Sequence, residues 1–411
     1  MIKHKKTVNY IGWILGLLTS ILYILCAEPT LSFWDCGEYI LTSSKLQVGH
    51  PPGAPLFQIF GAFFSIFSFG NTKLIPILIN SLSAIASGLT ITFLFWIIVR
   101  IMYRFSERYI SNIYAGIIGA LVFAFSDTFW NSAIEAEVYA LSILFTAITF
   151  WSILKWDEKP HPKWILLITF LIGLSIGVHL LSLLVLPAIL LIVYFHYSKP
   201  TMPGIITTLL ISILSLGLIL WLIIPGTLKL ISFNPSLIII LISVILIGLV
   251  ILSIWKKLPL LNTTVLAITF FLIGYSTFFV LAIRADSDTP INEYKPNTAG
   301  RLVSYLNRDA YGDTPLLYGP SYTAIPPKEF KMTEKGLEPV FERELMMVFP
   351  RMWNYNNPAY ESGYVEWVGM PQDTVIIDGE IRAKPSEIQI FNSLQTTKLD
   401  ICTCDICFGT L

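Results

Sequence analysis

The chain has 411 residues, of which 55% are hydrophobic and only 13% are charged. Soluble domains carry roughly 25% charged residues, so this composition indicates a membrane protein. The formal net charge is zero, which gives no reason to expect nucleic acid as a partner. Five cysteines, three of them among the last ten residues, do not form the framework of a disulfide-rich secreted domain.

The N-terminus combines a basic start, MIKHKK, with an apolar run that continues to residue 27. A cleaved signal peptide is one interpretation of this pattern. However, the apolar run is long for a signal peptide, and no cleavage site with small residues follows it. We therefore expect a first membrane span that is retained in the protein.

A helix needs about 20 apolar residues to cross the hydrocarbon core of a bilayer. Nine stretches come close to this length: 8–27, 74–98, 112–130, 138–154, 164–179, 181–197, 204–225, 236–255 and 263–283. Residues 55–70 are apolar as well, but the segment is short and contains Gly61. We expect it to lie at the membrane interface or to re-enter the membrane without crossing it.

The positions of Lys and Arg support this interpretation, because cytoplasmic loops of membrane proteins carry an excess of both. If residues 55–70 do not cross, most basic residues of the short loops fall on one side: Lys3, Lys5, Lys6, Arg100, Arg104, Arg108, Lys155, Lys159, Lys163, Lys199, Lys256 and Lys257. The opposite loops hold Lys45, Lys73 and Lys229. The sequence therefore predicts an all-α polytopic domain over residues 1–283, with about nine spans, a cytoplasmic N-terminus and the loop 28–73 outside.

After residue 283 the composition changes, with frequent Pro, Asn, Asp and Gly and only short apolar runs. We expect residues 284–385 to form a short soluble region of mixed structure on the outer face. The tail, residues 386–411, resembles neither part. Its three cysteines lack the second pair or the nearby His of a metal site. A surface tail and a shift of reading frame near the end of the gene are both open interpretations.

The outer loop 28–73 is the main polar interruption of the apolar sequence. Asp35 and Glu38 are three residues apart in FWDCGEY, which places both carboxylates on one face of a helix. A carboxylate at the membrane surface suits a general base that takes a proton from a hydroxyl group. His50 precedes a Pro-Pro-Gly turn and either contacts a phosphate or orients Asp35. The alternative is a set of solvated loop residues beside a helix start.

Four further residues are candidates for binding substrate: Glu135, Glu137, His179 and Arg284. The two acids precede an apolar run, where the helix dipole also favours them for structural reasons. We favour Glu137 as a ligand for the acceptor or for a metal. His179 is ionisable within a span, which indicates a cavity or a bond to neighbouring backbone. Arg284 meets a lipid-linked phosphate or extends to the membrane interface.

Nucleotide-binding and hydrolase motifs such as GxxxxGK[ST], GxGxxG, HExxH and GxSxG in their usual contexts are not found in the sequence. A transferase on the outer face has no nucleotide sugar within reach, so a lipid-linked sugar is the natural donor. We assign no cofactor and no metal ligands, and the need for a divalent metal stays open.

The order of a first span, an acidic outer loop and an HPP turn resembles the GT-C glycosyltransferases. More closely, FWDCGEY, GHPPGAPLFQIFGAFFSIF, FWNSAIEAEVYALS, GLSIGVHLLSLL and SYLNRDAYGDTPLLYGP are similar to a bacterial multi-pass family with an animal transmembrane protein O-mannosyltransferase as a relative. The resemblance covers about residues 8–385. It implies transfer of a sugar, expected to be mannose, from a polyprenyl phosphate to Ser or Thr of exported proteins. It also implies Asp35 as the catalytic base and a bacterial inner membrane as the location.

This chain departs from the family at its end. Members are usually longer, and beyond Lys384 they continue with an aromatic-rich segment that the tail lacks. The resemblance therefore implies that this chain inserts and binds donor but transfers sugar poorly or not at all. A transporter or lipid-carrier flippase is the alternative, and inverted repeats with midplane charges would indicate it. A scaffold that docks secretion machinery is a third interpretation.

Overall fold

The computed structural model describes residues 4–227, 235–311, 317–324, 329–333, 336–348, 350, 359–371, 373–377 and 380–384. The chain divides into two compact units, Met1–Asn307 and Arg308–Leu411, and each is described by itself. The atypical tail, residues 386–411 with its three cysteines, lies outside the described residues.

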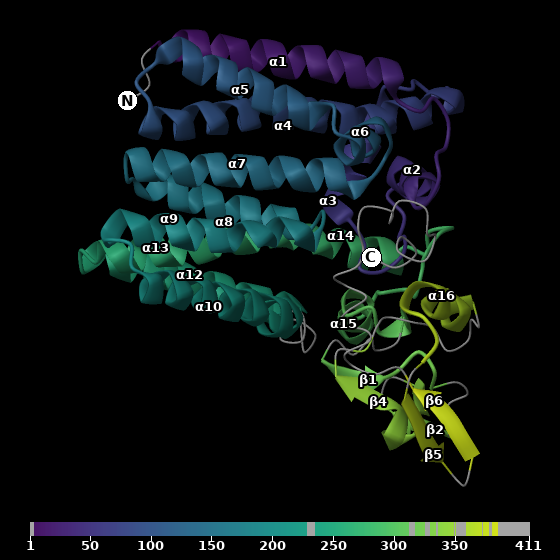
Figure 1. Ribbon diagram of the computed structural model, residues 1–411. Helices are drawn as coiled ribbons and strands as arrows, with labels where there is room; N and C mark the ends of the chain where they lie inside the picture. The colour runs from purple at the N-terminus through teal and green to yellow at the C-terminus, as the bar shows by residue number, and fades with distance from the viewer. Residues whose placement is uncertain are drawn as a thin grey trace. The chain divides into compact units, whose positions relative to one another are not determined.

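The first unit is a bundle of helices (Figure 1). Seven described stretches are long and apolar enough to cross a membrane. Three are single helices: α1 (Lys5–Cys26), α7 (Val138–Glu158) and α12 (Pro235–Trp255). Three combine two elements: η1 (Thr72–Leu74) with α4 (Ile75–Phe105), η2 (Leu180–Val185) with α9 (Leu186–Tyr197), and α10 (Met202–Leu218) with the π-helix η3 (Ile219–Ile223). The last combines α13 (Pro259–Tyr275), η4 (Ser276–Phe278) and α14 (Phe279–Asp286). Each coincides with a predicted span for most of its length, which confirms an all-α polytopic membrane protein.

Two of the nine predicted spans have a different form. The stretch 112–130 corresponds to two helices, α5 (Tyr109–Ala124) and α6 (Asp127–Ile134), which are bent by 68° at the break between them. The stretch 164–179 corresponds to α8 (Pro162–Ile176). Its 15 residues rise only about 22 Å, against about 30 Å for the hydrocarbon core. The described residues therefore hold seven long candidate spans, or eight if the bent pair counts as one.

The apolar segment after the outer loop forms α3 (Pro55–Ile66). Pro55 occupies the first turn, where proline is well tolerated because its missing N–H would have no helical partner. The helix has 12 residues and rises about 18 Å, so it is too short to cross. This agrees with the predicted interfacial or re-entrant segment.

Small residues allow several helices to approach closely. Between α1 and α4, a Cβ on Gly16 would collide with the hydroxyl of Thr92, which donates to the carbonyl of Gly12 at 3.1 Å. Between α8 and α13, a Cβ on Gly173 would collide with the carbonyl of Phe271. Close backbone approach at small residues is how helices associate in membranes, where no hydrophobic effect drives them together.

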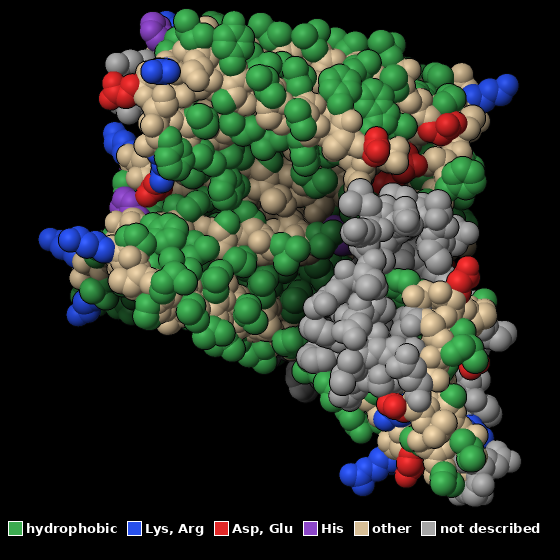
Figure 2. Space-filling model, in the orientation of Figure 1, with side chains coloured by type: hydrophobic (Ala, Val, Ile, Leu, Met, Phe, Trp, Pro, Cys, Tyr) green, Lys and Arg blue, Asp and Glu red, His purple; other side chains and the backbone are tan. Residues whose placement is uncertain are grey.

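Charged side chains on the first unit collect towards the ends of the helices, with an apolar band between them (Figure 2). At one end Arg100 pairs with Glu158 at 2.7 Å, and Asp157 contacts both Arg104 and His196. These residues lie in α4, α7 and α9, so the contacts connect three spans. The opposite end carries the connection between α1 and α3, which includes a short helix, α2 (Cys36–Ser44). The last helix of the unit is α15 (Ala299–Leu306).

The second unit consists of small elements. Three antiparallel pairs are described: β1 (Tyr318–Pro320) with β4 (Met346–Val348), β2 (Glu329–Thr333) with β3 (Gly336–Val340), and β5 (Asp373–Ile377) with β6 (Glu380–Lys384). The helical elements are η5 (Asp309–Tyr311), η6 (Arg343–Leu345) and α16 (Ala359–Val368). Tyr322, Met347 and Tyr364 are buried together, with the two tyrosine rings stacked at 4.9 Å. This is the mixed structure expected of the C-terminal region.

Candidate functional site

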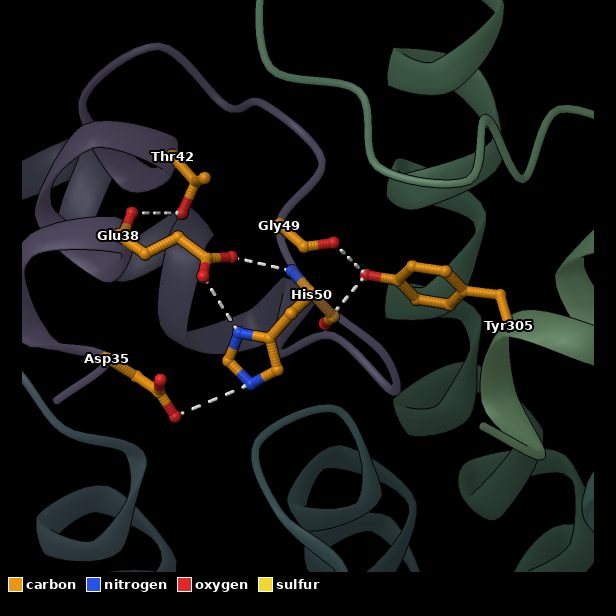
Figure 3. Close-up of polar contacts among 6 residues, drawn as sticks. All are labelled: Asp35, Glu38, Thr42, Gly49, His50 and Tyr305. Atoms are coloured by element: carbon orange, nitrogen blue, oxygen red, sulfur yellow. Dashed lines mark hydrogen bonds and ion pairs between the residues drawn. The ribbon is translucent and has the colours of Figure 1, made fainter. Parts of the chain in front are cut away.

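The connection between α1 and α3 brings Asp35, Glu38 and His50 together (Figure 3). Asp35 is the N-cap residue of α2, and Glu38 lies in the first turn. The Nε2 atom of His50 lies 3.6 Å from the Asp35 carboxylate, and its Nδ1 atom lies 3.1 Å from the Glu38 carboxylate. The loop predicted from sequence therefore places an imidazole ring between two carboxylates.

Helix α2 is held in place by its apolar face. Cys36, Tyr39 and Ile40 follow the helical spacing of three and four residues, and all three are buried in a cluster that includes Phe57 of α3 and Ile79 of α4. Because this face packs inward, the first turn leaves the neighbouring acids at the side of the helix. The side chain of Asp35 is 58% exposed, so a substrate can reach it.

Glu38 holds His50 through both carboxylate oxygens. One oxygen accepts a hydrogen bond from the His50 backbone N–H at 2.6 Å, and the other lies beside the ring Nδ1. Gly49 makes this possible, because a Cβ at position 49 would collide with the Glu38 carboxylate. The Glu38 carbonyl in turn accepts from the hydroxyl of Thr42 at 2.8 Å. The glycine before His50 is thus required by the close approach of Glu38.

These contacts favour a charged pair. The pKa of His50 is raised, chiefly by its hydrogen bond to Glu38; burial opposes the shift, and the charges of Glu38, Asp35 and Glu293 add to it. Burial alone would raise the pKa of Glu38, but its hydrogen bonds to His50 and the His50 charge lower it overall. Both shifts favour the imidazolium form of His50 and the carboxylate form of Glu38.

The same three side chains could hold a metal ion, since one ligand atom from each of Asp35, Glu38 and His50 lies within 4.8 Å of the others. A metal needs a neutral imidazole with a free lone pair. In the described geometry each ring nitrogen faces a carboxylate, and the raised pKa favours the protonated ring. A metal at this cluster would therefore compete with the proton of His50.

Glu135 and Glu137 lie in the connection between α6 and α7. The Glu135 carboxylate accepts from the hydroxyl of Ser32, and the Glu28 N–H donates to the carbonyl of Ile134 at 3.0 Å, so this connection lies against the segment that precedes α2. Glu137 is only 7% exposed. Burial, followed by the charges of Asp35 and Glu135, raises its pKa to about 8. Glu137 is therefore a neutral carboxylic acid at neutral pH, and its role in binding the acceptor stays a prediction.

His179 and Arg284 are both engaged with backbone. His179 is the N-cap residue of η2, where its Nδ1 atom accepts from the N–H of Leu181 at 3.1 Å. Arg284 donates from Nε to the carbonyl of Leu46 at 2.6 Å and from Nη2 to that of Lys45 at 3.2 Å. The arginine thus binds the end of α2 to α14. The predicted roles of both residues in binding substrate stay predictions.

The sequence reading missed the residues after the last span that hold the outer loop. Val48 donates its N–H to the carbonyl of Ile291 at 3.1 Å and accepts from the N–H of Glu293 at 3.1 Å. The N–H of Ile291 also donates to the Gln47 side chain at 2.9 Å. This parallel bridge brings Glu293 near the cluster, where burial and the charge of Glu38 raise its pKa.

Tyr305 is the other missed residue. It lies in α15 and is 2% exposed, and its hydroxyl lies 2.6 Å from the carbonyl oxygen of Gly49 and 3.0 Å from that of His50 (Figure 3). The amphipathic pattern of RLVSYLNRDAYG is typical of a short helix, in agreement with α15. Nothing local in the sequence indicates which residue, more than 250 positions away, the tyrosine contacts.

Comparisons with known proteins bear on this region. Residues 35–202 match the family described as the protein O-mannosyl-transferase TMEM260 N-terminal domain. The chain is 28% identical over 147 residues to protein O-mannosyl-transferase tmem260 of Dictyostelium discoideum, covering 36% of this chain and 17% of that protein. It is 29% identical over 143 residues to TMEM260 of Mus musculus, covering 34% and 19%.

The matched segment thus spans less than a fifth of the length of these two relatives. No solved structure shows significant similarity to the chain. The family match begins at Asp35 and includes Glu38 and His50, so it contains the whole acidic cluster of the outer loop. Together with the described spans, these likenesses support an O-mannosyltransferase-like membrane protein.

Proposed function

We propose that this protein transfers mannose from a polyprenyl-phosphate donor to Ser or Thr hydroxyls of exported proteins at the outer face of the membrane. The observation that carries the proposal is the exposed carboxylate of Asp35 beside the His50–Glu38 pair. This cluster lies in the segment that is similar to relatives named protein O-mannosyl-transferases.

In this mechanism Asp35 acts as the general base. It accepts the proton of the acceptor hydroxyl, whose oxygen forms a bond to C1 of the sugar. The bond between C1 and the phosphate oxygen breaks on the opposite side, and its electron pair leaves with the polyprenyl phosphate. The configuration at C1 is therefore inverted, and Asp35 returns its proton to solvent.

His50 supplies the positive charge beside the base. Of the two cations expected to meet the phosphate, His50 lies beside Asp35, whereas Arg284 donates to two backbone carbonyls. In the proposal, His50 is the residue whose positive charge stabilises the departing phosphate. Glu38, expected from sequence among the catalytic residues, has its carboxylate on the backbone and ring of His50. Its role in the proposal is to orient that ring and keep it protonated.

The orientation of the protein follows from its charges. Most Lys and Arg of the helical unit collect at one end (Figure 2), and α2, whose N-cap residue is Asp35, lies at the other end (Figure 1). The excess of Lys and Arg on cytoplasmic loops of membrane proteins supports an outer location for the cluster in this proposal. In a bacterial inner membrane this side offers exported proteins and lipid-linked sugars, which is the combination that the proposed reaction needs.

The test is single-turnover transfer by the purified chain in lipid nanodiscs, with a short-chain polyprenyl-phosphate mannose and a Ser/Thr peptide. Asp35→Asn should lower the rate by on the order of 10²- to 10⁴-fold, with donor binding and membrane insertion retained. Asp127→Asn is the matched control, because Asp127 is also an exposed acid in the first turn of a short helix. It should leave the rate within about twofold, since surface substitutions away from a site have small effects.

Transfer by Asp35→Asn at the wild-type rate would remove Asp35 from the mechanism. Movement of labelled donor across liposome membranes, without transfer to any peptide by the wild type, would support a flippase and contradict the proposed transferase.

A further inference from the structure

The backbone that carries His50 is held from two sides. On one side Glu38 of α2 accepts from its N–H, and on the other Tyr305 of α15 lies against its carbonyl (Figure 3). We propose that Tyr305 is a positioning residue for the transfer reaction, which fixes His50 in line with Asp35 without touching the substrate. This inference rests on the proposed function and extends it to a helix outside the matched family segment.

The contact of Tyr305 with the loop is close and buried. Its hydroxyl carries one proton, which is shared between the carbonyls of Gly49 at 2.6 Å and His50 at 3.0 Å. Gly53 lies against the same hydroxyl: its φ is +72°, and a Cβ there would lie 2.9 Å from the Tyr305 oxygen and 2.9 Å from Leu281 Cδ1. The turn after His50 is therefore shaped around the tyrosine.

The helix that carries Tyr305 is itself firmly packed. Leu302 and Val303 are buried with Tyr305 in one cluster that also contains Leu281 of α14 and Val48 of the outer loop. A tyrosine in such a position cannot follow the loop if the loop moves. The hydroxyl therefore acts as a fixed point to which the backbone of Gly49 and His50 is bonded.

The consequence for His50 follows from the number of bonds it makes. Its N–H and ring Nδ1 are held by Glu38, and its carbonyl is held by Tyr305. With both ends of the residue fixed, the ring Nε2 is directed at Asp35. The His50 carbonyl also accepts from the Gly53 N–H at 2.9 Å, so loss of the tyrosine hydroxyl affects mainly the buried Gly49 carbonyl. That carbonyl loses this donor, and the backbone directly before His50 shifts to find another. A displacement of about 1 Å at a catalytic group can reduce a rate by about 100-fold.

Tyr305→Phe tests the proposal, because it removes only the hydroxyl. Tyr23→Phe is the matched control: Tyr23 is 1% exposed and its hydroxyl donates to the carbonyl of Ala124 at 2.8 Å, between α1 and α5. Both variants lose one buried hydroxyl and keep the ring, although Tyr305 shares its proton between two carbonyls and Tyr23 donates to one. We expect similar losses of thermal stability but different effects on transfer and on His50.

Tyr305→Phe should lower kcat by on the order of 10- to 100-fold, with the KM for donor nearly unchanged. It should also shift the pKa of His50 down towards its ordinary value, as the ring moves away from Glu38, Asp35 and Glu293, whose charges raise that pKa. Isotope-labelled histidine followed by NMR reports this titration without any turnover. Tyr23→Phe should leave both kcat and the His50 titration unchanged.

Three further outcomes keep the proposal testable. If Tyr305→Phe does not fold, p-aminophenylalanine at position 305 supplies a weaker donor at the same place. The comparison is p-methylphenylalanine at position 305, which supplies no donor. A wild-type kcat for the p-methylphenylalanine variant would overturn the inference. Equal effects of Tyr305→Phe and Tyr23→Phe on kcat and on the His50 titration would also overturn it. If Tyr305→Phe shifts the His50 titration but neither the wild type nor any variant transfers sugar, the positioning role of Tyr305 stands and the proposed function is refuted.

Discussion

The two ends of the helical bundle both place a histidine beside a carboxylate, yet they differ in how their charges balance. At the basic end, Asp157 contacts Arg104 and His196, and Glu158 contacts Arg100 at 2.7 Å. Each carboxylate there has at least one permanent cation. Such a network connects α4, α7 and α9 and is complete without a ligand.

At the other end the acids outnumber the cations. Asp35 and Glu38 share His50, and the pKa values of Glu137 and Glu293 are raised, chiefly by burial and then by the charges of neighbouring acids. A stable fold does not need an excess of buried acid, and perturbed pKa values cluster at functional sites. This difference is consistent with the proposed function, which assigns the substrate to the Asp35 end.

The largest expected effect on the transfer rate comes from replacing the histidine at each end by glutamine in turn. His50→Gln removes the cation between Asp35 and Glu38, so single-turnover transfer should fall by on the order of 100-fold or more. In the wild type the rate should also fall as the pH rises through the raised pKa of His50. His196→Gln, at the basic end, should leave the rate nearly unchanged. Comparable losses in both variants would show that the two ends do not differ in function.

A second prediction concerns stability at the basic end. Asp157→Asn removes the charge that Arg104 and His196 share. Unfolding free energy should fall by about 1–2 kcal/mol, the range for a hydrogen bond to a charged group at a partly exposed site. Thermal unfolding in detergent measures this, and added salt should reduce the difference between the two proteins. A loss of transfer larger than the loss of folded protein would contradict a purely structural role.

The third prediction concerns the pH dependence of stability contributed by Glu137. Its pKa of about 8 in the folded protein lies above the ordinary value of 4.5. The folded protein thus keeps a proton that the unfolded chain releases, so this contribution to stability is full below pH 4.5 and declines as the pH rises to about 8. Glu137→Gln should remove the decline, and its unfolding midpoint should rise relative to wild type between pH 5 and pH 9. Parallel pH curves for the two proteins would show that Glu137 is ionised when folded.

The sequence predicted those features that depend on local composition. Apolar length identified the long spans, and the short stretch 55–70 proved too short to cross. The spacing of Asp35 and Glu38 puts both acids on one face if their segment is helical, and both meet His50 at the start of α2. The bend between α5 and α6 was missed, because apolar length alone does not show it. The Ser126–Asp127 pair at the break is a helix N-terminal signal that could have indicated it.

The remaining parts of the site depend on contacts between distant segments. Arg284 donates to the carbonyls of Lys45 and Leu46 because of how α14 packs. Tyr305 contacts the carbonyls of Gly49 and His50 because of how α15 packs. One sequence without relatives aligned to it holds no signal for such pairs. Charge and polarity identified the outer loop as the site, but they could not show what fixes it.

The helices of the first unit differ widely in how much protein surrounds them. In the most apolar part of Thr72–Phe105, 72% of residues are buried in the protein, but only 6% are buried in the corresponding part of Ser236–Trp255. A side chain of α12 that touches only lipid is replaceable by almost any other apolar residue, because lipid imposes no shape. Selection there can maintain hydrophobicity but not identity. We therefore expect the sequence of α12 to diverge between distant relatives faster than that of α4, even where the protein itself works in the same way.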